Sequence, residues 1–490
     1  MTKTSHRLGE AILAASFILS ACGSGTGGGS DGGIGSGTRP IVANATAQTN
    51  QYNVLSSLVK ASVSYAVKVQ VKYTAENGAS GSTPEVPVTS LDVSVPVLGL
   101  KPNTNYTLRL TAVGADGTRV DSDAISYHTG TLPSTLPTFT VTEQAGSEPG
   151  FTMIALIQDI LSGPGGSPRI AGPLIVDHTG AIVWYREAFE GPVIDWQRQP
   201  DGTYTVAINN IYLAELGYSD ARYFQMDGLG NVLRSYFALG AFVTDDHELR
   251  LQPNGDALLF ADNVRNMDLT AWGGQPSVDV YGNVLERISP NGQLLFAWNT
   301  LDQLDIGSAD PIILQGLPDA AWLDFTHGNA IDVMADGAYM MSFRHLSQLI
   351  KVDRAGSIVW KLGGVDGDFS FVNDPLNGFS FQHGARELPN GNILLFDNGN
   401  GHDPQHSRAV EYRLDVNAGT ATMVWQYVPD PPIFGAFMGF TQRLANGNTL
   451  IDYGARSVVQ EVNAAGQLIW ELRGPTTDGF YRAFRIPSLY

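Results

Sequence analysis

The sequence predicts an all-β protein: a six-bladed β-propeller preceded by a small immunoglobulin- or fibronectin-III-like β-sandwich. Three observations predict this fold. Apolar and polar residues alternate along short segments, as in strands with one buried face. The 55 Gly and 26 Pro residues fall in short clusters, as in tight turns between strands. From about residue 150 onward a strand–turn–strand pattern also recurs, which is typical of a repeat architecture.

The composition limits the classes of function. The chain of 490 residues is 43% hydrophobic and 16% charged, so it can bury the cores of two domains. Its 29 Lys and Arg residues against 48 Asp and Glu residues give a net charge of −19, which excludes sequence-independent binding to nucleic acid. An anionic substrate therefore needs a local basic pocket. The single cysteine excludes an internal disulfide and a cysteine-rich metal site.

The N-terminus predicts export and a lipid anchor. Basic residues precede the apolar run 11–19, which is too short to span a bilayer as a helix. The following Leu-Ser-Ala-Cys-Gly resembles a bacterial lipobox, so residues 1–22 are expected as a lipoprotein signal peptide and Cys22 as the lipidated first residue of the mature protein. Residues 23–39 read as a Gly/Ser tether, and the expected location is the outer membrane, facing the periplasm. The alternative is an ordinary secretory leader with an incidental cysteine.

Residues 40–130 predict the β-sandwich. They hold three alternating runs with turn signals between them: 61–71, 91–97 and 106–113. The segment Leu100–Tyr106 resembles the approach to the tyrosine corner of fibronectin-III and immunoglobulin-like domains. No catalytic cluster is present, which favours a spacer or packing role. A linker rich in Pro and Thr is expected over residues 131–150.

Residues 151–490 carry the repeat. One element is a turn between apolar strands, found at Pro200-Asp201-Gly202, Pro253-Asn254-Gly255, Ala335-Asp336-Gly337, Pro389-Asn390-Gly391 and Ala445-Asn446-Gly447. The other is a strand, a turn and a second strand that often ends in Trp, and it occurs six times. Six units over roughly 340 residues give about 57 residues each, which suits four short strands per blade. The longest irregular stretches, around 262–282 and 301–326, are expected as blade insertions.

Polar residues occupy one position of this repeat in three of five units. Counting back six residues from each turn reaches Ile194, His247, Asn329, His383 and Gly439. His327 lies two residues before Asn329 and Thr441 two residues after Gly439, so each shares a strand face with its neighbour. If the repeats are equivalent blades, these side chains converge on the propeller axis.

Such a cluster is either a metal site or a site for an anion and proton transfer. The His-x-Asn pair of His327 and Asn329 is a poor metal pair, and no His-Glu-x-x-His pattern is present. Arg344 follows a strand of the same unit as His327, and its planar guanidinium suits oxyanions. The residues therefore favour an anion site, with no metal and no cofactor.

The motifs around these residues resemble the bacterial arylsulfotransferase (aryl-sulfate sulfotransferase) family. They are Phe325-Thr326-His327-Gly328-Asn329, Ser342-Phe343-Arg344-His345, Phe381-Gln382-His383-Gly384-Ala385-Arg386 and Leu395-Phe396-Asp397-Asn398-Gly399. The resemblance extends over about residues 150–490. It implies an exported six-bladed propeller with a small β-sandwich in front, and transfer of a sulfuryl group from an aryl sulfate to a phenol without a nucleotide donor.

The resemblance also implies roles for single residues. His383 matches the nucleophilic histidine, which is transiently sulfated, so that the kinetics are ping-pong. His247 and His327 match the other catalytic histidines. Arg344 and Asn329 match the pair that contacts the sulfate, and Thr441 matches a hydroxyl contact in the last blade. The sequence does not decide which histidine serves as acid or base.

Two other classes of function stay open: a non-catalytic ligand-binding propeller, and an aryl sulfate hydrolase that uses water as acceptor. A quinone-dependent dehydrogenase is a weaker third possibility. The expected partners are a small aryl sulfate donor, a phenol acceptor and, through the lipid anchor, a membrane, but no nucleic acid. The oligomeric state is not determined by the sequence, and a homodimer is one option.

Overall fold

The computed structural model describes residues 38–158, 172–186, 193–209 and 221–490. Its contacts separate residues 1–38 from a second unit, Arg39–Tyr490. The predicted signal peptide, Cys22 and nearly all of the predicted tether lie outside the described residues. The prediction of an all-β chain is confirmed, because the helices of the described part are short. None of them is long and apolar enough to cross a membrane.

The first part of this unit consists of two β-sheets. One contains β1 (Ile41–Thr49), β2 (Ser57–Ser64) and β6 (Asp92–Val97). The other contains β3 (Lys68–Ala75), β4 (Ser80–Ser82), β5 (Val86–Pro87), β7 (Asn105–Val113), β8 (Arg119–Asp121) and β9 (Ile125–His128). Alternate residues of both sheets are buried in one shared hydrophobic cluster, as the alternating pattern predicts. The backbone N–H of Lys101 donates to the hydroxyl of Tyr106 (2.8 Å), which joins the start of β7 to the preceding turn.

From residue 140 onward the described residues form six further sheets. The first contains β11 (Phe151–Ile157), β12 (Pro173–Val176), β13 (Ile182–Tyr185) and β36 (Gly479–Ile486). The second contains β14 (Val193–Arg198), β15 (Tyr204–Asn209), β16 (Ala221–Met226) and β17 (Val232–Tyr236). The third contains β18 (Val243–Leu251), β19 (Ala257–Met267), β20 (Val278–Ile288) and β21 (Leu294–Asn299), and β22 (Trp322–Asp324) pairs in parallel with β20.

The remaining three sheets follow the same order. The fourth contains β23 (Gly328–Val333), β24 (Tyr339–Phe343), β25 (Gln348–Val352) and β26 (Ile358–Gly363). The fifth contains β27 (Ser370–Val372), β28 (His383–Glu387), β29 (Ile393–Asp397), β30 (Arg408–Asp415) and β31 (Thr420–Tyr427). The sixth contains β32 (Phe440–Arg443), β33 (Thr449–Asp452), β34 (Val458–Val462) and β35 (Leu468–Arg473). Within the segment expected as a linker, β10 (Thr140–Glu143) pairs with β35.

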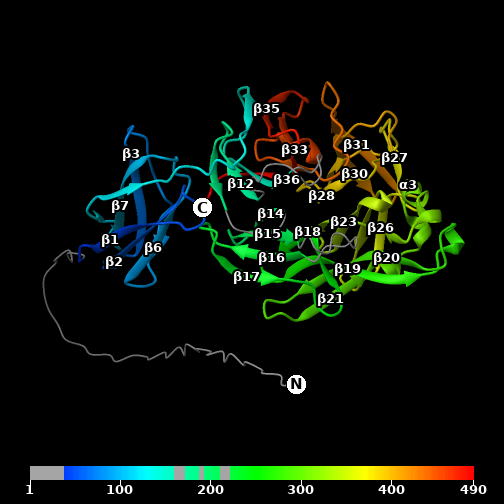
Figure 1. Cartoon of the computed structure of the whole chain (residues 1–490), viewed down its shortest axis with the longest axis horizontal. Helices are drawn as coiled ribbons and strands as arrows, with labels where there is room; N and C mark the ends of the chain where they lie inside the picture. Colours follow the sequence, from blue (N-terminus) through cyan, green and yellow to red (C-terminus); the bar gives the residue numbers. More distant parts are fainter. Residues whose placement is uncertain (1–37, 159–171, 187–192, 210–220) are drawn as a thin grey trace, which may run out of the picture. The chain divides into compact units, whose positions relative to one another are not determined.

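The inner strands of these sheets contact one another in a closed order: β14, β18, β23, β28, β32, β36 and again β14. Figure 1 shows the labels of β14, β18, β23, β28 and β36 close together between the sheets. The last strand of the chain, β36, completes the sheet that β11 begins, so the ring closes by pairing the two ends of this region. The fold is therefore β-propeller-like.

The recurring Trp residues join neighbouring sheets. The indole N–H of Trp184 on β13 donates to the carbonyl of Gly228 in a turn of the next sheet (2.9 Å). Three more Trp residues make the same bond to the next sheet: Trp298 to Gly356 (3.1 Å), Trp425 to Ala464 (3.3 Å) and Trp470 to His178 (2.9 Å). A buried indole N–H needs an acceptor, and here the adjacent sheet supplies it.

One expectation about irregular stretches is wrong. Residues 262–282 were expected as an insertion, but β19 continues to Met267 and β20 begins at Val278, and the two strands pair along their whole length. Only the short 3-10 turn η1 (Thr270–Trp272) and its flanks connect them. The stretch 301–326 does contain short helices, α2 (Thr300–Gln303) and α3 (Pro311–Leu314) among them.

Candidate active site

The polar positions of the repeat lie where the inner strands lose regular pairing. The register shifts between Ile194 and Gln197 in β14, Thr244 and Leu249 in β18, Gly328 and Ala330 in β23, and His383 and Arg386 in β28. Such bulges redirect side chains away from the regular alternation. The predicted convergence is observed for two histidines, because the rings of His247 and His327 lie 4.8 Å apart in an edge-to-face arrangement.

His383 is the first residue of β28, and it is 3% exposed. Its Nδ1 lies 2.7 Å from Oδ1 of Asn398, whose Nδ2 donates to the carbonyls of Gly435 (2.7 Å) and Met438 (2.9 Å). Because those two bonds direct the amide NH2 away, the amide oxygen faces His383, and we assign the imidazole proton to Nδ1. The Nε2 lone pair is then unshared, since no described residue hydrogen-bonds to it.

Two further features keep this imidazole neutral and in place. Burial, together with the positive charge of Arg344, lowers the pKa of His383 well below its usual value. Gly384 follows at φ +64°, and a Cβ there would lie 2.5 Å from Cδ2 of Phe440, so only glycine fits after His383. His383 thus presents an unprotonated Nε2 at neutral pH.

Asn398 is expected to act on activity through His383. Replacing Asn398 by Ala removes the bond that keeps the proton of His383 on Nδ1, so the other tautomer, with the proton on Nε2, becomes populated. We therefore expect kcat for any reaction at Nε2 to fall about 10- to 100-fold with little change in KM. The matched control is Asn448→Ala, a buried amide that donates to Gly146 (3.0 Å) and Glu461 (2.7 Å) instead. Steady-state kinetics on both variants, with melting temperatures, check this. Equal losses of kcat in the two variants would show a structural effect only.

Arg344 lies at the start of the 3-10 turn η4 (Arg344–Leu346), directly after β24. Its guanidinium donates to Nε2 of His345 (2.7 Å) and to the carbonyl of Ala436 (3.1 Å), and it stacks on the ring of Phe381 at 4.7 Å. Its Nε is buried without a partner among the described residues. Burial lowers the pKa of Arg344 to about 10, so the group stays cationic at neutral pH. A held cation with a free N–H is suited to binding an anion.

Asn329 and Thr441 differ in their contacts. Asn329 donates to the carbonyl of Gln382 (2.8 Å) and accepts from the N–H of Gly384 (3.2 Å), so its amide holds the backbone on both sides of His383. Thr441 is buried on β32, and its hydroxyl has no partner among the described residues. Buried polar atoms without partners are rare, and they point to an ion, water or ligand.

His327 is held by Asp324. Its Nδ1 donates to Oδ2 of Asp324 (2.5 Å), and its backbone is left-handed at φ 51°, a conformation that costs free energy in a residue other than glycine. His345 lies against it, with ring centroids 4.6 Å apart. The Nδ1 of His345 donates to the backbone carbonyl of Asp324 (2.7 Å), and burial lowers the pKa of His345 to about 3. His345 is therefore a neutral link between Asp324 and Arg344.

His247 lies on β18 beside two carboxylates. Its Nδ1 is 3.0 Å from Oδ2 of Asp245 and 3.2 Å from Oδ1 of Asp246. Burial alone would lower the pKa of His247, but these carboxylates outweigh it and raise the pKa to about 10. The hydroxyl of Tyr481 donates to the carbonyl of His247 (2.8 Å). His247 is thus a fixed cation rather than a group that exchanges a proton near neutral pH.

A buried ion network joins five of the inner strands. Arg482 on β36 donates to Asp195 on β14 (2.8 Å) and Glu248 on β18 (2.9 Å), and also to the carbonyl of Asn329 on β23. Arg386 on β28 donates to the same oxygen of Glu248 (2.7 Å). Bonded charges of this kind hold the strands in one arrangement. The network therefore supports the backbone that carries the histidines.

Four contributors to this arrangement were missed by reasoning from the sequence: Asp245, Asp324, His345 and Asn398. His345 and Asn398 belong to motifs that were recognised in the sequence. Their positions next to Arg344 and Asp397 were the only sequence feature that could have identified them as site residues. Nothing in the sequence showed that Asp324 or Asp245 lies against a histidine. Two groups of histidine and carboxylate side chains bring their potential ligand atoms within 4.8 Å of one another: Asp324 with His327 and His345, and Asp245 with Asp246 and His247.

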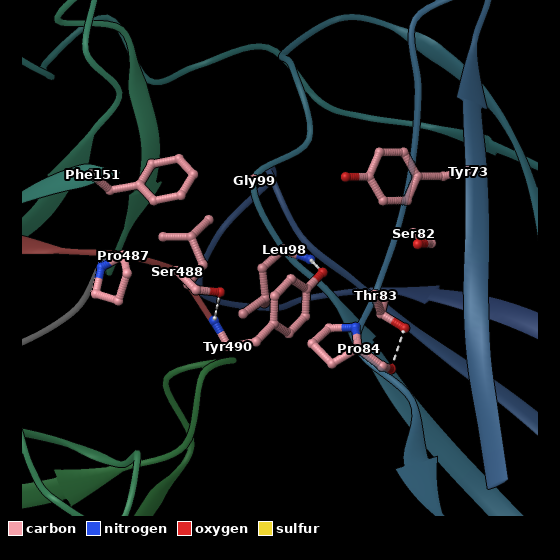
Figure 2. A pocket seen from close by; sticks show the side chains of 11 residues that line it. Tyr73, Ser82, Thr83, Pro84, Leu98, Gly99, Phe151, Pro487, Ser488 and Tyr490 are labelled. Atoms are coloured by element: carbon pink, nitrogen blue, oxygen red, sulfur yellow. Dashed lines mark hydrogen bonds between the residues drawn. The ribbon is translucent and has the colours of Figure 1, made fainter. Parts of the chain in front are cut away.

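A separate pocket of about 420 Å³ is lined by none of these residues. Figure 2 shows its lining, with Phe151 on one side, Tyr73 and Thr83 on the other, and Leu98 beside Tyr490 between them. The Tyr490 hydroxyl accepts from the N–H of Leu98 (2.9 Å). Its lining contains no histidine, carboxylate or basic side chain, so it does not offer the groups needed for acid–base or nucleophilic chemistry.

Fold and site together define a β-propeller-like protein with a neutral histidine beside a buried arginine. Residues 240–474 match the family described as arylsulfotransferase (ASST). The match includes His247, His327, Arg344 and His383, it confirms the resemblance seen in the motifs, and it supports an aryl sulfotransferase in general. No curated protein matches the chain.

Solved structures offer distant similarity. A protein of unknown function from Bacteroides caccae is 12% identical, with a TM-score of 0.43 over 70% of this chain and 100% of that chain. Virginiamycin B lyase from Staphylococcus aureus, in a catalytically inactive form with quinupristin, is 11% identical, with a TM-score of 0.35 over 67% of this chain and 87% of that chain. A hypothetical selenium-binding protein from Sulfolobus tokodaii is 13% identical, with a TM-score of 0.35 over 74% and 90%.

Proposed function

We propose that this protein transfers a sulfuryl group from an aryl sulfate ester to a phenol through a covalent sulfohistidine at His383. The observation that carries the proposal is the bond from His383 to Asn398, which leaves Nε2 unprotonated beside a cationic Arg344. A neutral, oriented imidazole is a nucleophile, and a covalent intermediate divides the transfer into two steps.

In the first step the lone pair of His383 Nε2 forms a bond to sulfur. The bond between sulfur and the aryl oxygen breaks, and its electron pair leaves with the phenolate. His327 delivers a proton to this oxygen, because its Nδ1 is held by Asp324 and no described residue hydrogen-bonds to its Nε2. Arg344 stabilises the charge on the sulfuryl oxygens, and Asn329 and Thr441 are proposed as further contacts.

In the second step a phenol replaces the first product. His327 removes the proton of its hydroxyl, the phenol oxygen forms a bond to sulfur, and the bond between sulfur and Nε2 breaks. The electron pair returns to His383, which restores the starting state. His247, which stays positively charged, adds to the attraction for the anionic substrate.

The architecture proposed for this activity is a six-bladed β-propeller preceded by an immunoglobulin- or fibronectin-III-like β-sandwich. The closed order of six inner strands supports the blade number. The bond from Lys101 to the Tyr106 hydroxyl supports the sandwich, because it has the pattern of a tyrosine corner. Export and lipidation at Cys22 stay a proposal from the N-terminal sequence, which lies outside the described residues.

The test uses an aryl sulfate such as 4-nitrophenyl sulfate without an acceptor. We expect the intact mass, measured after an alkaline quench, to increase by one sulfuryl group per chain, and we expect added phenol to discharge this group and to accelerate 4-nitrophenol release. Steady release that phenol does not accelerate would indicate a hydrolase. Absence of both adduct and release would indicate a ligand-binding propeller and would contradict the proposal.

A further inference from the structure

We infer that Asp245, Asp246 and His247 form a binding site for one divalent transition-metal ion, next to the proposed catalytic histidines. This departs from the sequence-based expectation of no metal, which rested on the poor metal pair of His327 and Asn329 and on the absence of cysteine ligands and of a His-Glu-x-x-His pattern. It does not depend on sulfuryl transfer, because it concerns a different set of ligand atoms.

The geometry is the first argument. Three successive residues of a regular strand point to alternate faces, but β18 is irregular between Thr244 and Leu249, and its three polar side chains meet. Nδ1 of His247 lies 3.1 and 3.0 Å from the two oxygens of Asp245 and 3.2 Å from Oδ1 of Asp246. Neighbouring ligands of an ion at about 2.0–2.2 Å lie about 2.8–3.1 Å apart at the right angle of octahedral coordination, and about 3.3–3.6 Å apart at the tetrahedral angle that Zn²⁺ prefers. The ligand atoms are therefore already near coordination spacing.

Charge is the second argument. Asp262 lies on β19, opposite Val243, and Asp324 ends β22, so the same sheet carries four carboxylates whose charges act on His247. The single N–H at Nδ1 of His247 faces three carboxylate oxygens, and it cannot make well-aligned hydrogen bonds to all three. A divalent cation would balance this negative charge better than a single proton.

An independent observation comes from Tyr223 on β16. Its side chain is 0% exposed, and its hydroxyl has no hydrogen-bond partner among the described residues. The charges that act on it are first that of Asp195 and then those of Asp245 and Asp246, so it lies within reach of the Asp195 network as well as of these two carboxylates. A fully buried hydroxyl without a partner indicates an additional group, such as an ion or a water bound to one.

The donor set points to the kind of metal. It combines imidazole nitrogen with carboxylate oxygens and contains no thiolate, which suits Zn²⁺ or Mn²⁺ better than the all-oxygen sites of Ca²⁺. The bound ion would replace the proton on His247 Nδ1 and keep this place positive. Because the rings of His247 and His327 lie 4.8 Å apart, the ion's charge would act on the proposed proton carrier.

The test uses the full chain without a histidine tag, treated with a chelator and then titrated with Zn²⁺ or Mn²⁺ by calorimetry. We expect saturable binding of one ion per chain and a rise in melting temperature. Asp246→Asn should weaken binding about tenfold or more, because it removes one ligand oxygen. The same change should leave the melting temperature of the metal-free protein unchanged or higher, since it reduces repulsion among the carboxylates.

The matched control is Asp279→Asn, an exposed aspartate on β20 of the same sheet, which should bind the metal like the wild type. It is needed because a chain with a net charge of −19 attracts cations non-specifically. His383→Asn should also retain binding, which separates this inference from the proposed activity. If Asp246→Asn does not fold, His247→Gln replaces it. Absence of saturable binding, or unchanged affinity in the ligand variant, would overturn the inference.

Discussion

Replacing His383 by Asn is expected to lower aryl sulfate turnover by at least about 1,000-fold, because it removes the atom that forms the bond to sulfur. Asparagine is smaller than histidine, and its amide can still donate to Asn398, so the fold should persist. The measurement is 4-nitrophenol release from 4-nitrophenyl sulfate in the presence of phenol, together with the melting temperature.

The adduct on the protein provides the second readout for this variant. We expect no gain of a sulfuryl group when donor is supplied alone. His128→Asn is the matched control, because His128 is an exposed histidine on β9 in the first part of the unit, and it should keep full activity. Turnover of His383→Asn near that of the wild type would rule out His383 as the nucleophile.

Arg344→Lys is expected to lower kcat/KM about 100- to 1,000-fold, the usual loss when a donor to a developing oxyanion is removed. Lysine keeps the charge but not the planar guanidinium, which donates at once to His345 and Ala436 and stacks on Phe381. The loss should appear in the rate of adduct formation on His383, because the charge on the sulfuryl group changes in that step.

Arg354→Lys is the control for this change. Arg354 also stacks on an aromatic ring, that of Tyr339 at 4.4 Å, but it is exposed and makes no contact with the histidines. We expect its kcat/KM to stay near the wild-type value. If Arg344→Lys has the same small effect, Arg344 does not bind the transferred group.

The strands could be predicted largely from the sequence because their signals are local. Turns such as Pro253-Asn254-Gly255 and the alternation within each run depend only on neighbouring residues. The recurring Trp was visible as well, although its bond to the next sheet was not, because the acceptor of Trp470 is the carbonyl of His178. The one wrong expectation, an insertion over 262–282, arose because β19 and β20 carry polar residues along their extensions.

The sequence indicated most of the residues of the candidate site, but not their protonation states. The repeat spacing brought out His247, Asn329 and His383, the strand period of two added His327, and Arg344 was found after a strand of the same unit. Their protonation depends on partners from other strands: Asn398 for His383, and Asp324 for His327. Those partners come from contacts that no spacing rule predicts.

The sequence by itself determined that this protein is built from repeated four-stranded units and that histidines recur at one position of the repeat. Alternation, turn motifs and repeat length depend on residues that are close together in the chain, so they can be recognised without knowledge of the three-dimensional structure. The tertiary structure alone decided that His383 is neutral with a free Nε2, that His247 is cationic, and that the charges of four carboxylates act on it. A pKa and a tautomer are set by burial and by groups within a few ångströms in space, and those groups come from separate sheets.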